Sequence, residues 1–328
     1  MNSIQLKAKN ELESKISKKE YKFEKVNCLI CNSSQFKKLA EKDRYGLSVS
    51  TVICKNCGLV QTNPRMNEES YIKFYDLEYR RLYVDEEQVP SHLFELKSQQ
   101  GKNILKYLEK VTKQKITKKF VVDIGTGSGG VLYPFKMQKN EVLGLDYGSL
   151  YLNYGRKKGL NLKLGGVEVL ENINKKIDVV IYRHVLEHLS NPIEELKKLR
   201  KFLHKDSIVY IEVPGLKNLH QSYNQDFLRY LQNAHLYHFT LKKIKEVGQI
   251  SGFKLIHGDE TIRSVFKIAN NNDDYSNDLS KTIKYLKEVE IMRKEPINSY
   301  KLKNTTLNIL KKAKLDKPIK KIYNYLLK

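Results

Sequence analysis

The sequence predicts an α/β fold: a Rossmann-like parallel sheet with helices on both faces. From Phe120 onward, short apolar runs typical of buried strands alternate with helical patterns. The apolar run at 121–124 ends in a glycine-rich loop at 125–130, as a buried strand does where it turns into a helix. Asp146 closes the next apolar run, about 20 residues further along, where an acid can accept hydrogen bonds from a ribose. A nucleotide-type cofactor site is therefore expected at the carboxyl ends of these strands.

The first segment, residues 1–66, is predicted to be a zinc-ribbon module. All four cysteines of the chain fall into two pairs, and each pair has two residues between its thiols. Four thiolates at this spacing can surround one zinc ion tetrahedrally, and a closed shell of four leaves no position for water. We therefore expect a structural zinc rather than a catalytic one, and the alternative is four unrelated buried thiols. The predicted ligands are Cys28, Cys31, Cys54 and Cys57.

Residues 67–115 are predicted to be a helical linker. The pattern from 67 to 84 is helical and rich in tyrosine, and a second helix at about 91–111 leads into the central strand. The run at 79–83 carries hydrogen-bond donors as well as aromatic rings, so it could close over a polar substrate as a lid. The alternative is ordinary half-buried packing of the tyrosines.

Residues 116–270 are predicted to be the cofactor-binding domain. Strands are expected near residues 120–124, 141–146, 161–164, 177–182 and 207–213. Helices are expected after Gly129, at about 149–158, at 192–203 and up to about Ser251. Two further strand-like runs follow at 253–257 and 261–269.

The glycine loop fits two cofactor patterns. Gly125, Gly127 and Gly130 fit the G-x-G-x-x-G of dinucleotide enzymes, whereas D-x-G-x-G-x-G begins at Asp123 and ends at Gly129. A carboxylate at Asp123 would repel a pyrophosphate, but it suits the ammonium group of S-adenosylmethionine, whose ribose could meet the second acid. S-adenosylmethionine is thus the expected cofactor, with a nicotinamide dinucleotide as the alternative. The predicted cofactor-binding residues are Asp123, Gly125, Thr126, Gly127, Gly129 and Asp146.

Histidines follow two of the expected strands. His184 and His188 come after the strand that ends near residue 182, and they share a face if a helical turn starts there. Residues 184–188 also match H-x-x-E-H, the inverted zinc-protease signature, but that signature needs a long helix and here it adjoins a strand. His235 lies in a later loop. An imidazole at such a place can take a proton from a substrate, so the candidate catalytic residues are His184, His188 and His235, in that order. The alternative for each is a hydrogen bond to the backbone.

Composition favours a folded protein with a solvated, basic surface. Hydrophobic residues make up 40% of the 328-residue chain, and no apolar run approaches the ~20 residues of a membrane span. The formal net charge is +23, but the positive charge is spread along the chain, so we expect no specific nucleic-acid partner. The N-terminus lacks the apolar stretch of a secretory signal, which predicts a cytoplasmic protein.

The tail, residues 271–328, is lysine-rich with a helical pattern. Its leucines and isoleucines from Leu307 to Leu326 fall roughly on one side among the lysines. We expect a helix packed on the domain. The alternative is a basic amphipathic segment at the anionic inner face of the cell membrane.

Taken together, the motifs resemble class I S-adenosylmethionine-dependent methyltransferases. They are similar to the branch with an N-terminal four-cysteine zinc ribbon among bacterial sugar and surface-polysaccharide methyltransferases. The resemblance covers residues 25–270 and rests on the four cysteines, the loop at 123–129, Asp146, and the segments 184–189 and 234–239.

The resemblance implies specific roles for the motifs. Asp123 and the glycines would hold the methionine part of the cofactor, Asp146 its ribose, and residues 184–188 would line the methyl-transfer site. The acceptor would be a saccharide, a sugar nucleotide or a related cell-envelope precursor.

The chain departs from its relatives in two places. Residues 165–168 are Gly-Gly-Val-Glu where many relatives have an acid that meets the adenine. The segment after residue 270 is shorter than the further domain of many sugar C-methyltransferases, which leaves oxygen methylation open. The rival hypothesis from another class is a non-catalytic zinc-ribbon protein that binds nucleic acid by its positive surface.

Overall fold

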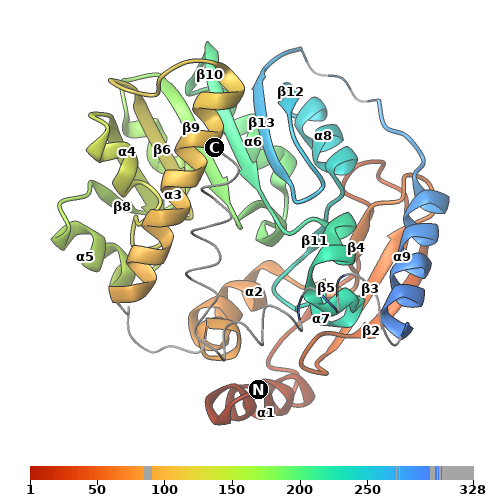
Figure 1. The fold of residues 1–328 in the computed structure, drawn as a ribbon. Helices are drawn as coiled ribbons and strands as arrows, with labels where there is room; N and C mark the ends of the chain where they lie inside the picture. The colour runs from red at the N-terminus through yellow and green to blue at the C-terminus, as the bar shows by residue number, and fades with distance from the viewer. Residues whose placement is uncertain are drawn as a thin grey trace.

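The computed structural model describes residues 1–84, 91–270, 272, 274–295, 300, 302 and 304, and its centre is a seven-stranded sheet (Figure 1). The strand order is β12-β13-β10-β9-β6-β7-β8. The strands are β6 (Phe120–Ile124), β7 (Glu141–Asp146), β8 (Leu162–Leu164), β9 (Ile177–Arg183), β10 (Leu203–Glu212), β12 (Phe253–His257) and β13 (Arg263–Ile268). Strands β8, β7, β6, β9 and β10 run parallel, whereas β13 is antiparallel to β10 and to β12. The predicted α/β fold with a Rossmann-like sheet is confirmed.

Helices cover both faces of this sheet because the central strands are apolar on both faces. Val121 of β6 packs into one core cluster with α3, α4 and α5, and its neighbour Val122 packs into the other with α6 and α8. These helices are α3 (Ser91–Thr112), α4 (Tyr133–Met137), α5 (Ser149–Lys157), α6 (Pro192–Arg200) and α8 (Leu241–Ile250). The parallel strands therefore end at one edge, where the loops after β6, β7 and β9 meet.

The N-terminal segment forms a second, smaller sheet. Along the chain, this segment contains α1 (Ser3–Ser17), β1 (Phe23–Glu24), β2 (Phe36–Lys42), β3 (Ser48–Cys54), β4 (Val60–Thr62) and β5 (Arg65–Met66). The sheet order is β11-β4-β3-β2, and its fourth strand, β11 (Tyr237–His238), comes from far along the chain. Strands β2, β3 and β4 and the loop that precedes α8 therefore share one hydrogen-bonded sheet, whereas β1 and β5 pair in a separate two-stranded sheet.

A tyrosine-rich helical stretch connects the two sheets. It consists of α2 (Glu68–Phe74) and a π-helix at Tyr75–Val84. The rings of Tyr75 and Tyr79 stack with centroids 4.5 Å apart, and both meet the ring of His188 edge-on. The stretch also packs against Leu12 of α1 in one core cluster. The predicted helical pattern is present, and its tyrosines are packed over a histidine of the larger domain.

The remaining elements are short, apart from the last helix. Short 3-10 turns lie at Val167–Asn172, Leu186–His188, Leu216–Gln221 and Tyr223–Gln225, and α7 spans Phe227–Tyr230. Helix α9 (Leu279–Lys294) lies alongside the small sheet (Figure 1), where the side chain of Asn277 donates to the carbonyl of Lys55.

The amphipathic pattern predicted from Leu307 to Leu326 lies outside the described residues. Among the residues that are described, no helix combines the length and apolar character needed to cross a membrane. The limits predicted for the four domains stay predictions.

Candidate functional site

The glycine loop follows β6 in a conformation that requires glycine. Gly125, Gly127 and Gly129 have φ angles of +75°, +56° and +74°, which residues with a Cβ rarely adopt. A Cβ on Gly125 would lie 2.3 Å from Cγ2 of Val185. The loop is therefore pressed against the segment that follows β9, and the two predicted motifs lie side by side.

Asp146 ties this loop to the end of β7. Its Oδ2 accepts a hydrogen bond from the backbone N–H of Gly127 at 2.8 Å, and its Oδ1 accepts one from Gly148 at 2.7 Å. A carboxylate oxygen can accept more than one hydrogen bond, so Asp146 keeps capacity for a ligand. The structure brings this predicted ribose-binding acid to the predicted loop.

Asp123 is buried beneath the loop. The residue is 2% exposed, and its Oδ2 accepts a hydrogen bond from Oγ1 of Thr126 at 2.7 Å. Burial raises the pKa of Asp123 to about 7, because the charged form loses its hydration. A cationic group placed beside this carboxyl would favour ionisation and so be bound by it.

Two cations, Lys97 and Arg183, lie near the loop. Burial lowers the pKa of Lys97 on α3, and the nearby Arg183 charge lowers it further. Arg183 donates from Nε to Oε1 of Glu212 at 3.1 Å. Lys97 also packs on the loop, since a Cβ added to Gly130 would lie only 2.6 Å from the Cβ of Lys97. Nothing in the sequence distinguishes Lys97 from the other lysines, because its role depends on how α3 crosses the loop.

The rim beyond β8 contains an exposed polar pair, Glu168 and Tyr147. Glu168 accepts hydrogen bonds at Oε1 from the Tyr147 hydroxyl at 2.8 Å and from the N–H of Gly166 at 2.6 Å. Tyr147 directly follows Asp146 and is 72% exposed. Glu168, in the segment where the sequence departs from its relatives, thus lies beside an exposed aromatic ring.

His184 does not begin the helical turn on which a shared face with His188 would depend. Its φ is +55°, and its N–H donates to the carbonyl of Glu212 at 2.8 Å, so the chain turns sharply out of β9. Only the 3-10 turn Leu186–His188 follows. His184 and His188 therefore do not share a face of an α-helix, and the long helix of the protease signature is not formed. The side chain of His184 is 39% exposed, with Nδ1 3.3 Å from Oε1 of Glu187.

The other two predicted histidines lie close together, with His235 buried and His188 partly buried. The rings of His188 and His235 lie 4.8 Å apart, edge to face. Nδ1 of His188 hydrogen-bonds the carbonyl of Ala234 at 2.8 Å, and the Tyr75 hydroxyl contacts the same nitrogen. Burial lowers the pKa of His188, and it lowers the pKa of His235 further still, so both rings are neutral near pH 7. The predicted catalytic histidines thus differ in access, since His184 is the exposed one.

The four cysteines form a compact thiol cluster. The Sγ atoms of Cys28 and Cys57 are 3.4 Å apart, as are those of Cys31 and Cys54, and all four lie within 4.8 Å of one another. Zinc–sulfur bonds of about 2.3 Å in a tetrahedron separate the sulfurs by about 3.8 Å. These separations fit one zinc ion.

The two cysteine turns have the same backbone geometry. In the first, Cys28 donates to Ser33 and Asn32 donates back to Cys28, both at 2.9 Å. In the second, Cys54 donates to Leu59 at 2.8 Å and Gly58 donates back to Cys54 at 2.9 Å. The residue after each second cysteine is left-handed, with φ of +55° at Asn32 and +80° at Gly58. The repeated turn aims both thiols of each pair at a common centre.

The cysteine sheet supports the loop that carries His235. Thr62 of β4 donates from its hydroxyl to the carbonyl of His235 at 2.8 Å and from its N–H to Leu236 at 2.9 Å. Arg65 reaches the Tyr237 hydroxyl at 3.1 Å. The buried His235 is therefore held in place by the zinc-ribbon segment.

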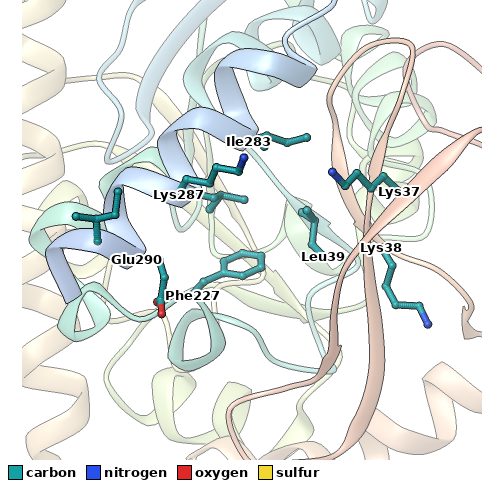
Figure 2. Close-up of a pocket in the computed structure, with 9 residues that line it drawn as sticks. Lys37, Lys38, Leu39, Phe227, Ile283, Lys287 and Glu290 are labelled. Atoms are coloured by element: carbon teal, nitrogen blue, oxygen red, sulfur yellow. The ribbon is translucent and has the colours of Figure 1, made fainter. Parts of the chain in front are cut away.

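A separate groove of about 500 Å³ lies between β2, α7 and α9 (Figure 2). Lys37, Lys38 and Leu39 line one side and Ile283, Lys287 and Glu290 the other, with Phe227 at the base. None of the predicted site residues lines it, so the candidate site remains at the carboxyl edge of the large sheet.

Part of the chain is similar to known methyltransferases. Residues 96–258 match the family model described as a methyltransferase domain. A tRNA U34 carboxymethyltransferase of Campylobacter fetus is 35% identical over 103 residues, which are 29% of this chain and 36% of that protein. A probable (S)-tetrahydroprotoberberine N-methyltransferase 2 of Papaver bracteatum is 31% identical over 115 residues, 33% of this chain and 31% of that protein. The chain thus spans about a third of the length of these relatives.

Among solved structures, the plantazolicin methyltransferase BamL, in complex with a triazolic desmethylPZN analog and SAH, resembles the fold with a TM-score of 0.42. It is 19% identical, and the match covers 71% of this chain and 87% of that chain.

Proposed function

We propose that this chain, which carries a methyltransferase domain at residues 96–258, transfers a methyl group from S-adenosylmethionine to a hydroxyl of a saccharide, sugar nucleotide or related cell-envelope precursor. The observation that carries the proposal is the pairing of two acids with the glycine loop. Asp146 holds the loop by hydrogen bonds, and Asp123 is buried beneath it with a raised pKa. A donor with a ribose and an ammonium group, and without a pyrophosphate, matches these two acids.

The residues around the loop fit this donor. When bound, S-adenosylmethionine supplies a methyl group activated by the sulfonium. Asp146 would accept hydrogen bonds from ribose hydroxyls, and Asp123 would bind the ammonium group. Lys97 and Arg183 are the cations near Asp123 and would bind the methionine carboxylate.

The acceptor side is lined by rings and by the acid–histidine cluster. Tyr75 and Tyr79 stack on each other and meet His188 edge-on, and Glu187 contacts both His188 and His184. Aromatic faces beside a few polar groups suit a small polyhydroxylated ring. The four thiols would hold a structural zinc whose task is to keep the His235 loop in place.

His184 is the residue that we propose takes the acceptor proton. Replacing it with alanine is expected to lower turnover by about 10²–10⁴-fold, while the affinity for S-adenosylhomocysteine stays within about twofold. Turnover is measured as S-adenosylhomocysteine release after a screen of sugar nucleotides, and affinity by calorimetry. His204→Ala is the control, since that histidine pairs with Asp178 at the amino ends of the strands. Full turnover in His184→Ala would remove this residue from the mechanism.

The raised pKa of Asp123 predicts that cofactor affinity depends on pH. A bound ammonium group requires the ionised carboxylate, which is the minor form of the free protein below pH 7. Affinity for S-adenosylhomocysteine should therefore fall at least about tenfold from pH 7.5 to pH 5.5, by calorimetry. In Asp123→Asn the affinity should be low and nearly flat with pH. A wild-type affinity that is constant over this range would contradict the assignment.

The raised pKa of Asp123 also determines how the stability of the folded protein changes with pH. A carboxyl whose pKa is higher in the folded protein contributes stability below its unfolded pKa, near 3.8, and loses it as the pH rises to about 7. Asp123→Asn should accordingly stabilise the cofactor-free protein above pH 7.

A nucleic-acid acceptor is the second candidate. It is favoured by the name of the Campylobacter relatives, which are tRNA U34 carboxymethyltransferases. The two candidates are distinguished by incubating the protein with methyl-labelled S-adenosylmethionine in the presence of sugar nucleotides and of bulk tRNA. Label in the tRNA alone would move the acceptor to RNA while leaving the donor site unchanged.

A further inference from the structure

We propose that Glu187, His188 and His235 bind one divalent transition-metal ion at a second site, separate from the four thiols. One ligand atom from each of the three residues lies within 4.8 Å of the others. The cluster lies between the end of β9 and the loop before β11, on the acceptor side of the glycine loop.

Two of the three residues present buried atoms without partners. Oε2 of Glu187 and Nδ1 of His235 have no hydrogen-bond partner among the residues that the structure describes. Glu187 is 1% exposed and His235 3%. A buried carboxylate oxygen and a buried ring nitrogen left unpaired are destabilising unless a ligand satisfies both.

The third residue is oriented as a metal ligand would be. Nδ1 of His188 bonds to the carbonyl of Ala234 at 2.8 Å, which leaves Nε2 on the side of Glu187, 3.8 Å from its Oε1. Metal-binding histidines commonly donate their other ring N–H to a backbone carbonyl in this way. In His235 the corresponding nitrogen, Nε2, contacts the side-chain amide of Gln232.

Glu187 also lacks a strong countercharge. Within the described part of the chain, its ion-pair contacts are to His184 and His188. Both partners are histidines, which carry no charge unless protonated, so they are weak partners for a buried carboxylate. A divalent cation would neutralise the carboxylate and bind both ring nitrogens at once.

The three ligands indicate which class of metal ion the site would bind and whether the ion could take part in catalysis. Two imidazoles and one carboxylate suit zinc and similar first-row ions rather than calcium or magnesium. Three protein ligands leave an open position, as in catalytic metal sites.

The role of this ion rests on the proposed function. The acceptor hydroxyl would occupy the open position, where the metal lowers its pKa. The O–H bond breaks and the proton passes to His184, the O–CH₃ bond forms, and the S–CH₃ bond breaks with its electron pair left on sulfur.

The test is a metal count on the full-length, zinc-loaded protein. Cobalt(II) is added, the protein is desalted, and zinc and cobalt are measured per chain together with the visible spectrum. The expected result is one cobalt in addition to the zinc, with a spectrum free of thiolate charge-transfer bands. In Glu187→Gln and His235→Gln the cobalt affinity should fall at least about tenfold with the zinc retained.

His238→Gln is the matched control, since His238 is a buried histidine of the same loop that lies outside the cluster. Binding of S-adenosylhomocysteine is measured on every variant and is expected to be unchanged. Absence of a second metal from the wild type, with that binding intact, overturns the metal site and leaves the proposed function standing. Equal loss of cobalt in His238→Gln would also overturn the assignment of these three residues.

Discussion

Asp146→Ala is expected to weaken binding of S-adenosylhomocysteine at least about 100-fold, or about 3 kcal/mol. The substitution removes the acceptor of two backbone hydrogen bonds, from Gly127 and Gly148, along with the proposed ribose contacts. Hydrogen bonds to a charged group contribute about 1.5–3 kcal/mol each, so losing several at once has a large effect. The affinities are compared by calorimetry at pH 7.5.

Glu141→Ala is the matched control for this experiment. Glu141 begins the same strand, β7, at the opposite edge of the sheet, and its partner is the exposed Lys175. Wild-type affinity is expected in this variant. Equal binding by Asp146→Ala and the wild type would show that the acid at the end of β7 does not hold the donor.

Cys57→Ser is expected to abolish turnover while leaving donor binding nearly intact. A serine replaces one of four thiols around the proposed zinc, and a small module of this kind depends on its metal for folding. Strand β4 would then lose its order and no longer hold β11 through the Gln61–Tyr237 pairing, and the His235 loop would loosen. Turnover should fall at least about 100-fold, with S-adenosylhomocysteine affinity within a few-fold of wild type because the glycine loop lies on the larger sheet.

The measurements for this variant are zinc content, amide hydrogen exchange at Tyr237 and His238, and calorimetry. Lys55→Ala is the control, because this exposed side chain lies inside the same cysteine turn without being a ligand. A Cys57→Ser protein that keeps its turnover would show that the cysteine sheet does not support the acceptor site. Loss of donor binding would show instead that the whole fold depends on the ribbon.

The elements that the sequence predicts well are those with local causes. Strand β6 is recognisable because Val121 and Val122 are buried on opposite faces, which produces a continuous apolar run. Helices α6 and α8 begin at caps visible in the sequence, since Asn191 accepts from Glu194 and Thr240 accepts from Lys243. Spacing alone likewise predicted that the four thiols would meet.

The features that the sequence does not reveal depend on distant contacts. Strand β11 is two residues long, too short to show a pattern, and it forms because β4 pairs with it. Whether a helical turn starts at His184 could not be read from the sequence, because the chain there turns left-handed and bonds across to Glu212. Lys97 becomes part of the site only through the crossing of α3 over the loop.

The most direct test of the central claim is calorimetric titration of the purified protein with S-adenosylhomocysteine and, separately, with NADH. The two acids at the glycine loop predict micromolar binding of the first and no detectable binding of the second. Binding of NADH instead would place the chain among the oxidoreductases. Binding of neither would show that the loop, Asp123 and Asp146 do not form a cofactor site.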